Sequence, residues 1–274
     1  MKKRFWKILA LVLALALTFG LAAFANSLVG NPVSKWLAQR GAEEYLLEHY
    51  PDCYVDSLGF NFKFTSYYAH IRSKDSIDTQ FTLQIDYFGR VYYDTYESVE
   101  KGYVTERRLD DAYRAMTERI LDDPSMELDF SISFGELCIS EGFLIGDPQH
   151  YDIPEFSMAL EELERDKEYD IRELGARCGK LVVYVGSPEV TFEKAAEIML
   201  LLRERFDRDG VPFKAMDFVL HPPKSEDGPW MENEIRVENF LYEDISPEGL
   251  AQRIQTAHEA LAEFYAYLDS EKIK

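Results

Sequence analysis

The chain has 274 residues, and its 50 acidic residues outnumber its 30 lysines and arginines, which gives a formal net charge of −20. A surface this acidic repels nucleic-acid phosphates, so the composition argues against a nucleic-acid partner. Apolar residues make up 46% of the chain, enough to build packed cores in one large or two smaller domains. We expect two domains.

Residues 1–31 have the composition of a membrane-targeting segment. Four basic residues precede an uninterrupted run of apolar or small residues, Ile8–Ala25; the basic residues are Lys2, Lys3, Arg4 and Lys7. Because cations stay on the cytoplasmic side, this pattern predicts a single transmembrane helix in the cell membrane, N-inside, with the rest of the chain outside. Ala23-Phe24-Ala25 is also a small-x-small cleavage signal, so a secreted protein cleaved after Ala25 is the alternative.

Residues 32–122 are predicted to form a membrane-proximal α+β domain of a helix, an antiparallel meander and a second helix. Residues 33–49 have a helical pattern, and the side predicted to face inward consists of Trp36, Leu37, Ala42, Tyr45 and Leu46. Segments rich in aromatic and β-branched residues predict strands at 54–64, 67–71 and 81–93. Phe88-Gly89-Arg90 interrupts the third segment, which indicates two strands joined as a hairpin. From Thr105 onward, apolar residues return at helical spacing.

Residues 126–274 are predicted to form a second domain, a two-layer α/β sandwich, because Pro124 and its acidic neighbours end the preceding helix. The predicted strands are 128–139, with a break or bulge at Gly135, then 181–185, 216–220 and 235–237. The uninterrupted apolar run at 181–185 predicts the centre of the sheet. The predicted helices are 156–163, 192–206 with a cap at Gly210, and 246–268. The expected fold class is α+β, with an N-terminal transmembrane helix followed by two small α+β units.

No residue pattern in the sequence matches a known catalytic, cofactor or metal site, so we predict no catalytic residue, no cofactor and no metal ligand. The histidines stand singly, without H-E-x-x-H or another paired spacing; they are His49, His70, His150, His221 and His258. Asp207-Arg208-Asp209-Gly210 is similar to half of a calcium loop but lacks the remaining ligands, so we interpret it as a helix end. An envelope hydrolase with a site between the two domains is the alternative function, with His70 or His221 and nearby carboxylates as candidate residues.

The three cysteines, Cys53, Cys138 and Cys178, lack the C-x-x-C spacing of zinc and redox motifs. Their odd number allows at most one disulfide. Cys138 and Cys178 fall in the same predicted domain, so a disulfide between them and two buried free thiols are open alternatives.

Two segments carry a binding hypothesis. An aromatic cluster lies in a predicted half-buried sheet, where one alternate set faces the core and the other is available as an exposed surface; it consists of Phe60, Phe62, Phe64, Tyr67 and Tyr68. The second segment is the proline-bearing loop His221–Ser225 at a strand end, a place where functional residues often lie. Core packing and an ordinary connector are the alternative interpretations of these two segments.

After the leader, residues 31–96 resemble the YfjL-like proteins of Gram-positive bacteria. The resemblance rests on Asn31-Pro32-Val33-Ser34, Gly59–Phe64, Tyr67–His70 and Ser76–Phe81. That family is uncharacterised and combines an N-terminal membrane helix with an N-terminal and a C-terminal domain. The resemblance therefore implies an anchor and a two-domain division, and it transfers no catalytic residue.

These observations together predict a membrane-anchored extracytoplasmic protein that acts as a non-catalytic binding or regulatory module at the cell envelope. The predicted sheet of the first domain is small enough to offer an open edge to a partner strand. The expected partners are the membrane, through the single N-terminal helix, and an envelope protein of unknown identity.

Overall fold

The computed structural model describes Trp6, residues 11–18, Gly20, residues 30–223 and residues 233–272. The chain divides into two compact units, Met1–Val104 and Thr105–Lys274, and each has its own hydrophobic core. Within the described residues, every helix is too short or too polar to span a lipid bilayer. Half of the predicted membrane helix Ile8–Ala25, including the cleavage position after Ala25, lies outside the described residues.

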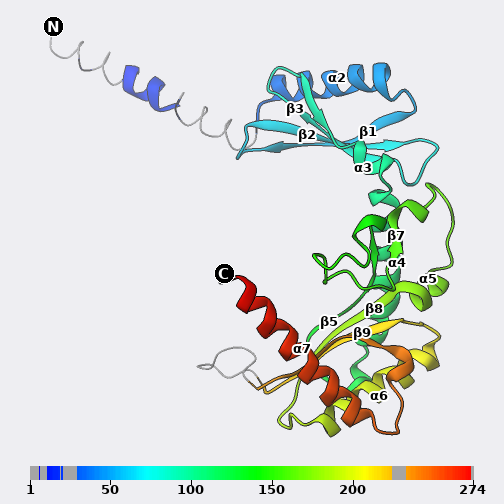
Figure 1. Cartoon of the computed structure of the whole chain (residues 1–274). Helices are drawn as coiled ribbons and strands as arrows, with labels where there is room; N and C mark the ends of the chain where they lie inside the picture. Colours follow the sequence, from blue (N-terminus) through cyan, green and yellow to red (C-terminus); the bar gives the residue numbers. More distant parts are fainter. Residues whose placement is uncertain (1–5, 7–10, 19, 21–29, 224–232, 273–274) are drawn as a thin grey trace. The chain divides into compact units, whose positions relative to one another are not determined.

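The first unit places one long helix against a four-stranded antiparallel sheet (Figure 1). Its elements are α2 (Pro32–His49), β1 (Cys53–Asn61), β2 (Ser66–Ser73), β3 (Gln80–Ile85), β4 (Val91–Asp94) and the one-turn helix α3 (Glu97–Glu100). Each strand pairs with the next one along the chain. The predicted helix and meander are confirmed, including the hairpin at Phe88-Gly89-Arg90, where β3 is joined to β4.

Helix α2 buries a narrow stripe that recurs at every fourth residue, and the stripe consists of Ser34, Ala38, Ala42 and Leu46. These mostly small side chains let the helix approach the sheet closely. The contact is so tight that a Cβ on Gly41 would lie 1.8 Å from the carbonyl oxygen of Gly89 in the β3–β4 turn. The predicted inward position of Trp36 is wrong, because the small residues face the sheet and leave the Trp36 side chain 57% exposed.

Side chains alternate between the core and solvent along β2 and β3. The buried set, which packs with α2, is Tyr67, Ala69, Ile71, Phe81, Leu83 and Ile85. Between them, Tyr68, His70 and Arg72 are exposed. This period of two is the signature of a sheet with one face in the core and the other in water.

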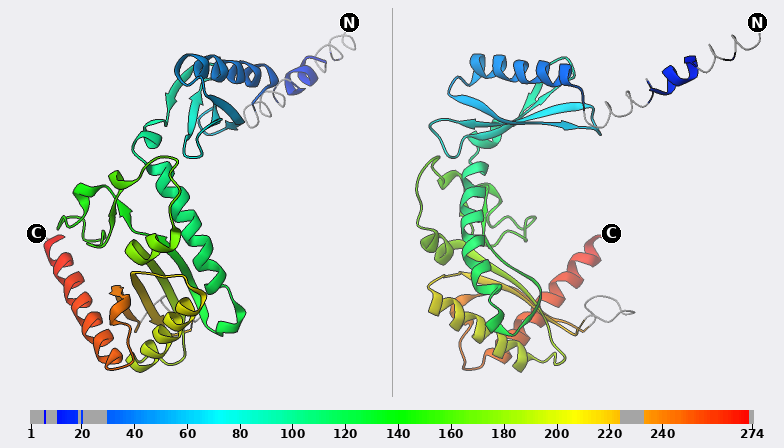
Figure 2. Two further views of the ribbon diagram at one scale, coloured as in Figure 1. Left: turned by 90° about the vertical axis from the view of Figure 1, so that its right-hand side faces the viewer. Right: turned by 180° about the vertical axis from the view of Figure 1, so that it is seen from behind.

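The second unit contains a four-stranded mixed sheet in the order β10-β9-β8-β5, in which β8 and β9 run parallel. Its elements are α4 (Tyr103–Leu121), β5 (Asp129–Leu137), β6 (Ile139–Ser140), β7 (Met158–Ala159), α5 (Ile171–Cys178), β8 (Gly179–Gly186), α6 (Phe192–Asp209), β9 (Ala215–His221), β10 (Ile235–Leu241) and α7 (Leu250–Lys272). Figure 2 shows α4, α6 and α7 around this sheet. The inner position of β8 confirms the prediction for 181–185, and the α+β fold class is confirmed.

By its packing, α4 belongs to the second core. Its buried Leu109 and Tyr113 join the core that contains Leu181 and Val183 of β8. The Tyr113 hydroxyl donates to the carbonyl oxygen of Pro212 at 3.0 Å. We predicted this helix as part of the domain at 32–122, since helical spacing shows that one side is buried but not which core that side faces.

Four further segments of the second unit differ from the prediction. Residues 156–163 form β7 and a 3-10 turn at Leu160–Glu162 instead of a helix. Helix α7 begins at Leu250 because Gly249 adopts a φ of +67°, which is outside the helical range. The irregularity of β5 lies between Phe130 and Ile132 and not at Gly135. The short helix α5 was not predicted.

Candidate functional site

The exposed face of the first sheet is the strongest candidate binding surface, and we call it the tyrosine face. Its side chains come from all four strands and are Tyr54, Tyr68, His70, Thr82, Gln84 and Tyr93. Tyr68 and Tyr93 both lie opposite Gln84, and His70 lies opposite Thr82. The exposed fractions of Tyr54, Tyr68 and Tyr93 are 41%, 36% and 54%. The register thus gathers exposed aromatic and polar groups on one face.

Gly59 fixes the position of Tyr68. A Cβ on Gly59 would lie 2.2 Å from Cζ of Tyr68, so the phenol ring occupies the space that a side chain on β1 would fill. The ring also meets His70 edge-on, with 5.4 Å between the ring centroids. Nδ1 of His70 in turn lies 3.4 Å from Oγ1 of Thr82. Neighbouring groups therefore hold the centre of the tyrosine face in place.

The chemistry of the tyrosine face suits binding. Each tyrosine ring offers an apolar surface with a polar hydroxyl at its end, and Thr82 and Gln84 both donate and accept hydrogen bonds. The ion pair at its margin, between Arg72 and Asp56 at 3.4 Å, is too exposed to contribute much to stability. In the part of the chain that the structure describes, no group of three or more His, Cys, Asp or Glu side chains is arranged to hold a metal.

The predicted aromatic cluster divides into three parts. Phe60 and Tyr67 face the core and pack against each other, with 5.0 Å between their ring centroids. Tyr68 belongs to the tyrosine face. Phe62 and Phe64 lie in the turn between β1 and β2 and are 56% and 77% exposed. Core packing therefore accounts for only two of the five aromatic residues.

His221 is buried at the end of β9 and is paired with Ser131 on β5. The Ser131 Oγ lies 2.7 Å from Nε2 of His221, and Nδ1 lies 2.8 Å from the carbonyl oxygen of Pro222. Because a carbonyl oxygen only accepts, Nδ1 carries a proton, and in the neutral ring Nε2 is then an acceptor that faces the serine hydroxyl. The same hydroxyl has a second acceptor, the carbonyl oxygen of Tyr184 at 3.3 Å. A serine and its general base share this geometry, but here a carbonyl group stands where a carboxylate orients the base in a catalytic triad. His70, the other predicted candidate, lies in the first unit.

A row of charged groups crosses the sheet of the second unit and was not predicted. Nζ of Lys180 on β8 lies 3.1 Å from Oε1 of Glu136 on β5 and 3.0 Å from Oδ2 of Asp217 on β9. The other carboxylate oxygen of Asp217 accepts the backbone N–H of Asn239 at 2.6 Å. Burial alone lowers the pKa of Lys180, but the charges of Asp217 and Glu136 outweigh it and hold this pKa above its ordinary value. Lys180 is therefore a cation that joins three strands, not a general base.

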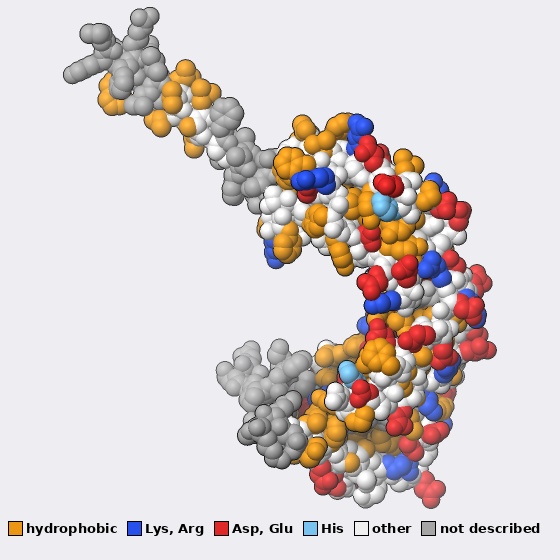
Figure 3. Space-filling model, turned by 45° about the horizontal axis from the view of Figure 1, so that its top comes forward, with side chains coloured by type: hydrophobic (Ala, Val, Ile, Leu, Met, Phe, Trp, Pro, Cys, Tyr) orange, Lys and Arg blue, Asp and Glu red, His pale blue; other side chains and the backbone are white. Residues whose placement is uncertain are grey.

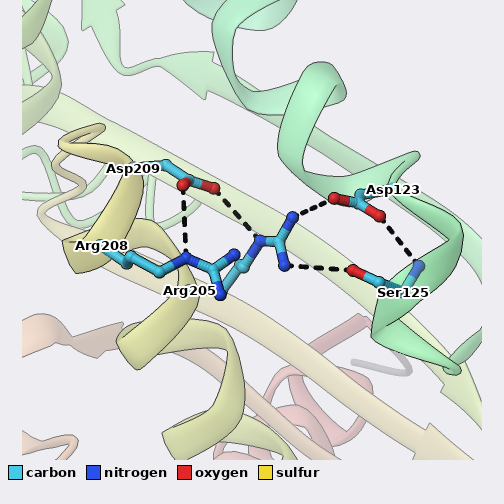
Figure 4. A network of polar contacts seen from close by, with 5 residues as sticks. All are labelled: Asp123, Ser125, Arg205, Arg208 and Asp209. Atoms are coloured by element: carbon cyan, nitrogen blue, oxygen red, sulfur yellow. Dashed lines mark hydrogen bonds and ion pairs between the residues drawn. The ribbon is translucent and has the colours of Figure 1, made fainter.

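The acidic motif at 207–210 is a helix end, which confirms its interpretation. Helix α6 ends at Asp209, and Gly210 adopts a φ of +65°. Figure 4 shows Asp209 facing Arg205 and Arg208, while Arg205 also reaches Asp123 and Ser125. The network ties the end of α6 to the chain that precedes β5.

A groove with a volume of about 590 Å³ lies between β10 and α7. Asn239 lines it with a φ of +50°, and the buried Oδ1 of Asn239 has no hydrogen-bond partner among the described residues. The guanidinium of Arg253 in the same groove already donates to the carbonyl oxygens of Asp244, Ser246 and Glu248. The groove therefore offers a single unsatisfied acceptor, which makes it a weaker candidate than the tyrosine face.

The cysteines are free thiols. The backbone N–H of Cys138 donates to the carbonyl oxygen of Cys178 at 2.8 Å, so the two residues are neighbours where β5 ends and β8 begins. Burial raises the pKa of Cys138 to about 12 and that of Cys178 to about 11. Both thiols therefore stay protonated near neutral pH.

Comparison with known proteins gave two matches to family models. The model of the YfjL-like N-terminal domain matches residues 2–95, and the model of the YfjL-like C-terminal domain matches residues 112–255. No curated protein and no solved structure matches the chain.

Proposed function

The chain belongs to the YfjL-like family, and on that premise we propose that it is a membrane-anchored binding module of a Gram-positive bacterium. In this proposal the N-terminal helix crosses the cell membrane once, N-inside, and both units lie outside, where they bind an envelope protein without catalysis. The basic head and the apolar run Ile8–Ala25 support the anchor. The acidic composition supports a partner other than a nucleic acid.

The tyrosine face is the observation that carries the binding proposal. Aromatic side chains are enriched where proteins meet, because a ring buries a large apolar area while its polar end keeps a hydrogen bond. Tyr54, Tyr68 and Tyr93 are exposed together on a sheet whose opposite face already supplies the core. Since the fold does not need these rings inside the core, a partner surface that covers them accounts for their position.

Photo-crosslinking in intact cells tests this role. We would place a benzoylphenylalanine at Tyr93 in the full chain and repeat the experiment with Tyr54→Ser and Tyr68→Ser added. The proposal predicts a discrete crosslinked partner that disappears in the combined variant. Leu201, an exposed residue of α6, provides the matched control position. Identical crosslinked products from Tyr93 and Leu201 would contradict binding through the tyrosine face.

The anchor has its own test, which is the intact mass and the partitioning of the native protein. A full-length chain in the membrane pellet supports the single-pass topology. A chain that starts at Asn26 and is found in the medium would overturn it in favour of a secreted protein cleaved after Ala25.

An envelope hydrolase is the second candidate function, and the contact of 2.7 Å between Ser131 and His221 favours it. Such an enzyme would use Ser131 as the nucleophile and His221 as its base. Treatment of the full chain with a fluorophosphonate probe tests the idea. Labelling that disappears in Ser131→Ala would establish the hydrolase, whereas an unlabelled wild-type chain leaves the pair with a structural role.

A further inference from the structure

Three separate segments meet at one end of the first unit. The turn between β1 and β2, the turn between β3 and β4, and the beginning of α2 all lie there, because β1 and β3 run the same way in the meander. Hydrogen bonds hold these segments together: the Ser34 Oγ lies 2.7 Å from the Tyr67 hydroxyl, and the Asn31 side chain donates to the Tyr87 hydroxyl at 3.3 Å. Gly89 packs on the backbone of Leu37.

Large apolar side chains at this end point into solvent, and we call the end the aromatic rim. Its exposed residues, with their exposed fractions, are Val33 (67%), Trp36 (57%), Phe62 (56%), Phe64 (77%) and Phe88 (72%). Each of the three segments contributes at least one of them. Apolar groups gathered this way on a protein surface mark a place that something covers.

The aromatic rim is basic, although the protein as a whole is strongly acidic. Residues 26–42, 57–74 and 87–93 contain no aspartate or glutamate. Asp86 in the β3–β4 turn is paired with Arg90 at 2.8 Å, and Arg40 is paired with Glu44 at 2.7 Å, so the positive charge of the rim comes from its lysines. Lys35 and Lys63 have no ion pair in the part of the chain that the structure describes, and Arg40 lies over the Trp36 ring at 5.8 Å. Figure 3 shows hydrophobic and basic side chains together where α2 begins. Exposed aromatic rings beside lysine and arginine are the composition of membrane–water interfaces.

The length of the connecting chain keeps the aromatic rim close to any span formed by Ile8–Ala25. Gly30 lies at the rim, because a Cβ on it would lie 2.4 Å from the hydroxyl oxygen of Tyr67. Five residue steps separate Ala25 from Gly30, and a fully extended chain covers at most about 3.6 Å per step, which amounts to about 18 Å. Even a stretched connection therefore leaves the rim within reach of the lipid headgroups.

We propose that the aromatic rim lies on the outer surface of the phospholipid bilayer, with its rings among the headgroups and its lysines against lipid phosphates. This inference rests on the proposed function, because it assumes that Ile8–Ala25 spans the membrane. The inference gives the first unit an orientation, in which the end that carries the first turn of α2 faces the lipid. The first unit then binds the membrane surface directly and is not connected to it through the anchor alone.

Fluorescence of Trp36 in the full chain tests the docking. Trp6→Phe and Trp230→Phe leave Trp36 as the only tryptophan, and the protein is reconstituted in vesicles of phosphatidylethanolamine and phosphatidylglycerol. We expect lipids with a shallow nitroxide label to quench Trp36 and the membrane to shield it from acrylamide. Adding Phe62→Ser and Phe64→Ser should remove most of the lipid quenching, while the protein still floats with the vesicles.

Phe143→Ser provides the matched control, because Phe143 is 73% exposed in the second unit. This substitution should leave the quenching of Trp36 unchanged. A chain that floats with the vesicles while its Trp36 is quenched by acrylamide but not by labelled lipid overturns the docking and leaves the anchor intact. A full-length chain that does not float at all refutes the proposed anchor itself, and the docking with it.

Discussion

Replacing Lys180 by methionine removes the cation between two carboxylates and keeps the apolar stem of the side chain. Glu136 and Asp217 would then face each other across β8 without a positive charge. Loss of one member of a fully buried ion pair costs about 3–5 kcal/mol of the free energy of unfolding. The side chains of Glu136 and Asp217 are 34% and 19% exposed, so water offsets part of this cost and we expect about 2–3 kcal/mol.

Amide hydrogen exchange of the β8 peptide measures this loss in the second unit alone. A loss of 2–3 kcal/mol corresponds to about 30- to 150-fold faster exchange when exchange follows global opening of the unit. Lys180→Met combined with Asp217→Asn should exchange more slowly than the single variant, because it removes one of the two uncompensated charges. Lys194→Met is the control, since Lys194 pairs with the exposed Glu197 and its substitution should cost at most about 0.5 kcal/mol.

The dependence on pH follows from the direction of the pKa shift. The pKa of Lys180 is raised, so its contribution to stability is fully present below the unfolded-state value of about 10.4 and is lost only at higher pH. The loss of free energy of unfolding caused by Lys180→Met should therefore be the same at about pH 7 and pH 9. Two results would refute the role of this charged row. One is a wild-type exchange rate in Lys180→Met. The other is a double variant whose loss of free energy of unfolding equals the sum of the losses measured for Lys180→Met alone and for Asp217→Asn alone.

Three further predictions concern packing and titration. Gly41→Ala should lower the free energy of unfolding of the first unit by about 1–3 kcal/mol in a urea titration, because the new methyl group meets the carbonyl oxygen of Gly89; an unchanged midpoint contradicts this. The Cys138 thiol should react with a disulfide reagent far more slowly in the folded chain than in urea, since its pKa of about 12 leaves little thiolate; equal rates contradict the burial. Burial, followed by the charge of Asp94, raises the pKa of Tyr50 to about 12. The contribution of the protonated Tyr50 hydroxyl to stability is therefore present below about pH 10 and is lost as the pH rises through 12. An ultraviolet titration in which Asp94→Asn does not lower the pKa of Tyr50 contradicts the assignment.

Local patterns predicted the elements whose partners are near in the sequence. The meander of the first unit follows from alternation at Phe81–Ile85 and from the turn at Phe88-Gly89-Arg90, because each strand pairs with the next one. Which side chains of a helix face the sheet was harder to predict. The hydrophobicity of Trp36 suggested an inward position, but the distance between α2 and the sheet is set by the small side chains, and no helical pattern shows how close that contact is.

The candidate sites depend on contacts between residues far apart in the chain, which explains why the sequence did not reveal them. Ser131 and His221 are separated by ninety positions and meet only because β5 and β9 flank β8. In the sequence, Lys180 directly precedes an apolar run and has the position of an ordinary polar residue at the start of a strand. Only the strand order places carboxylates on both sides of it. The tyrosine face was partly predictable, since alternation along β2 places Tyr68 on the other face of the sheet from the buried Tyr67. Tyr54 and Tyr93 join this face only through the register of β1 and β4.

The strand order of the two sheets has a consequence for how the chain folds during synthesis. In the first unit every strand pairs with its predecessor, so all the loops to be closed are short and the sheet can form once residues up to β4 have emerged. In the second unit β5 must wait for β8 across residues 138–178, and β8 must wait for β9 across the whole of α6. The N-terminal unit can therefore reach its native contacts early and alone, whereas β5 remains an unpaired strand until most of the chain has been made.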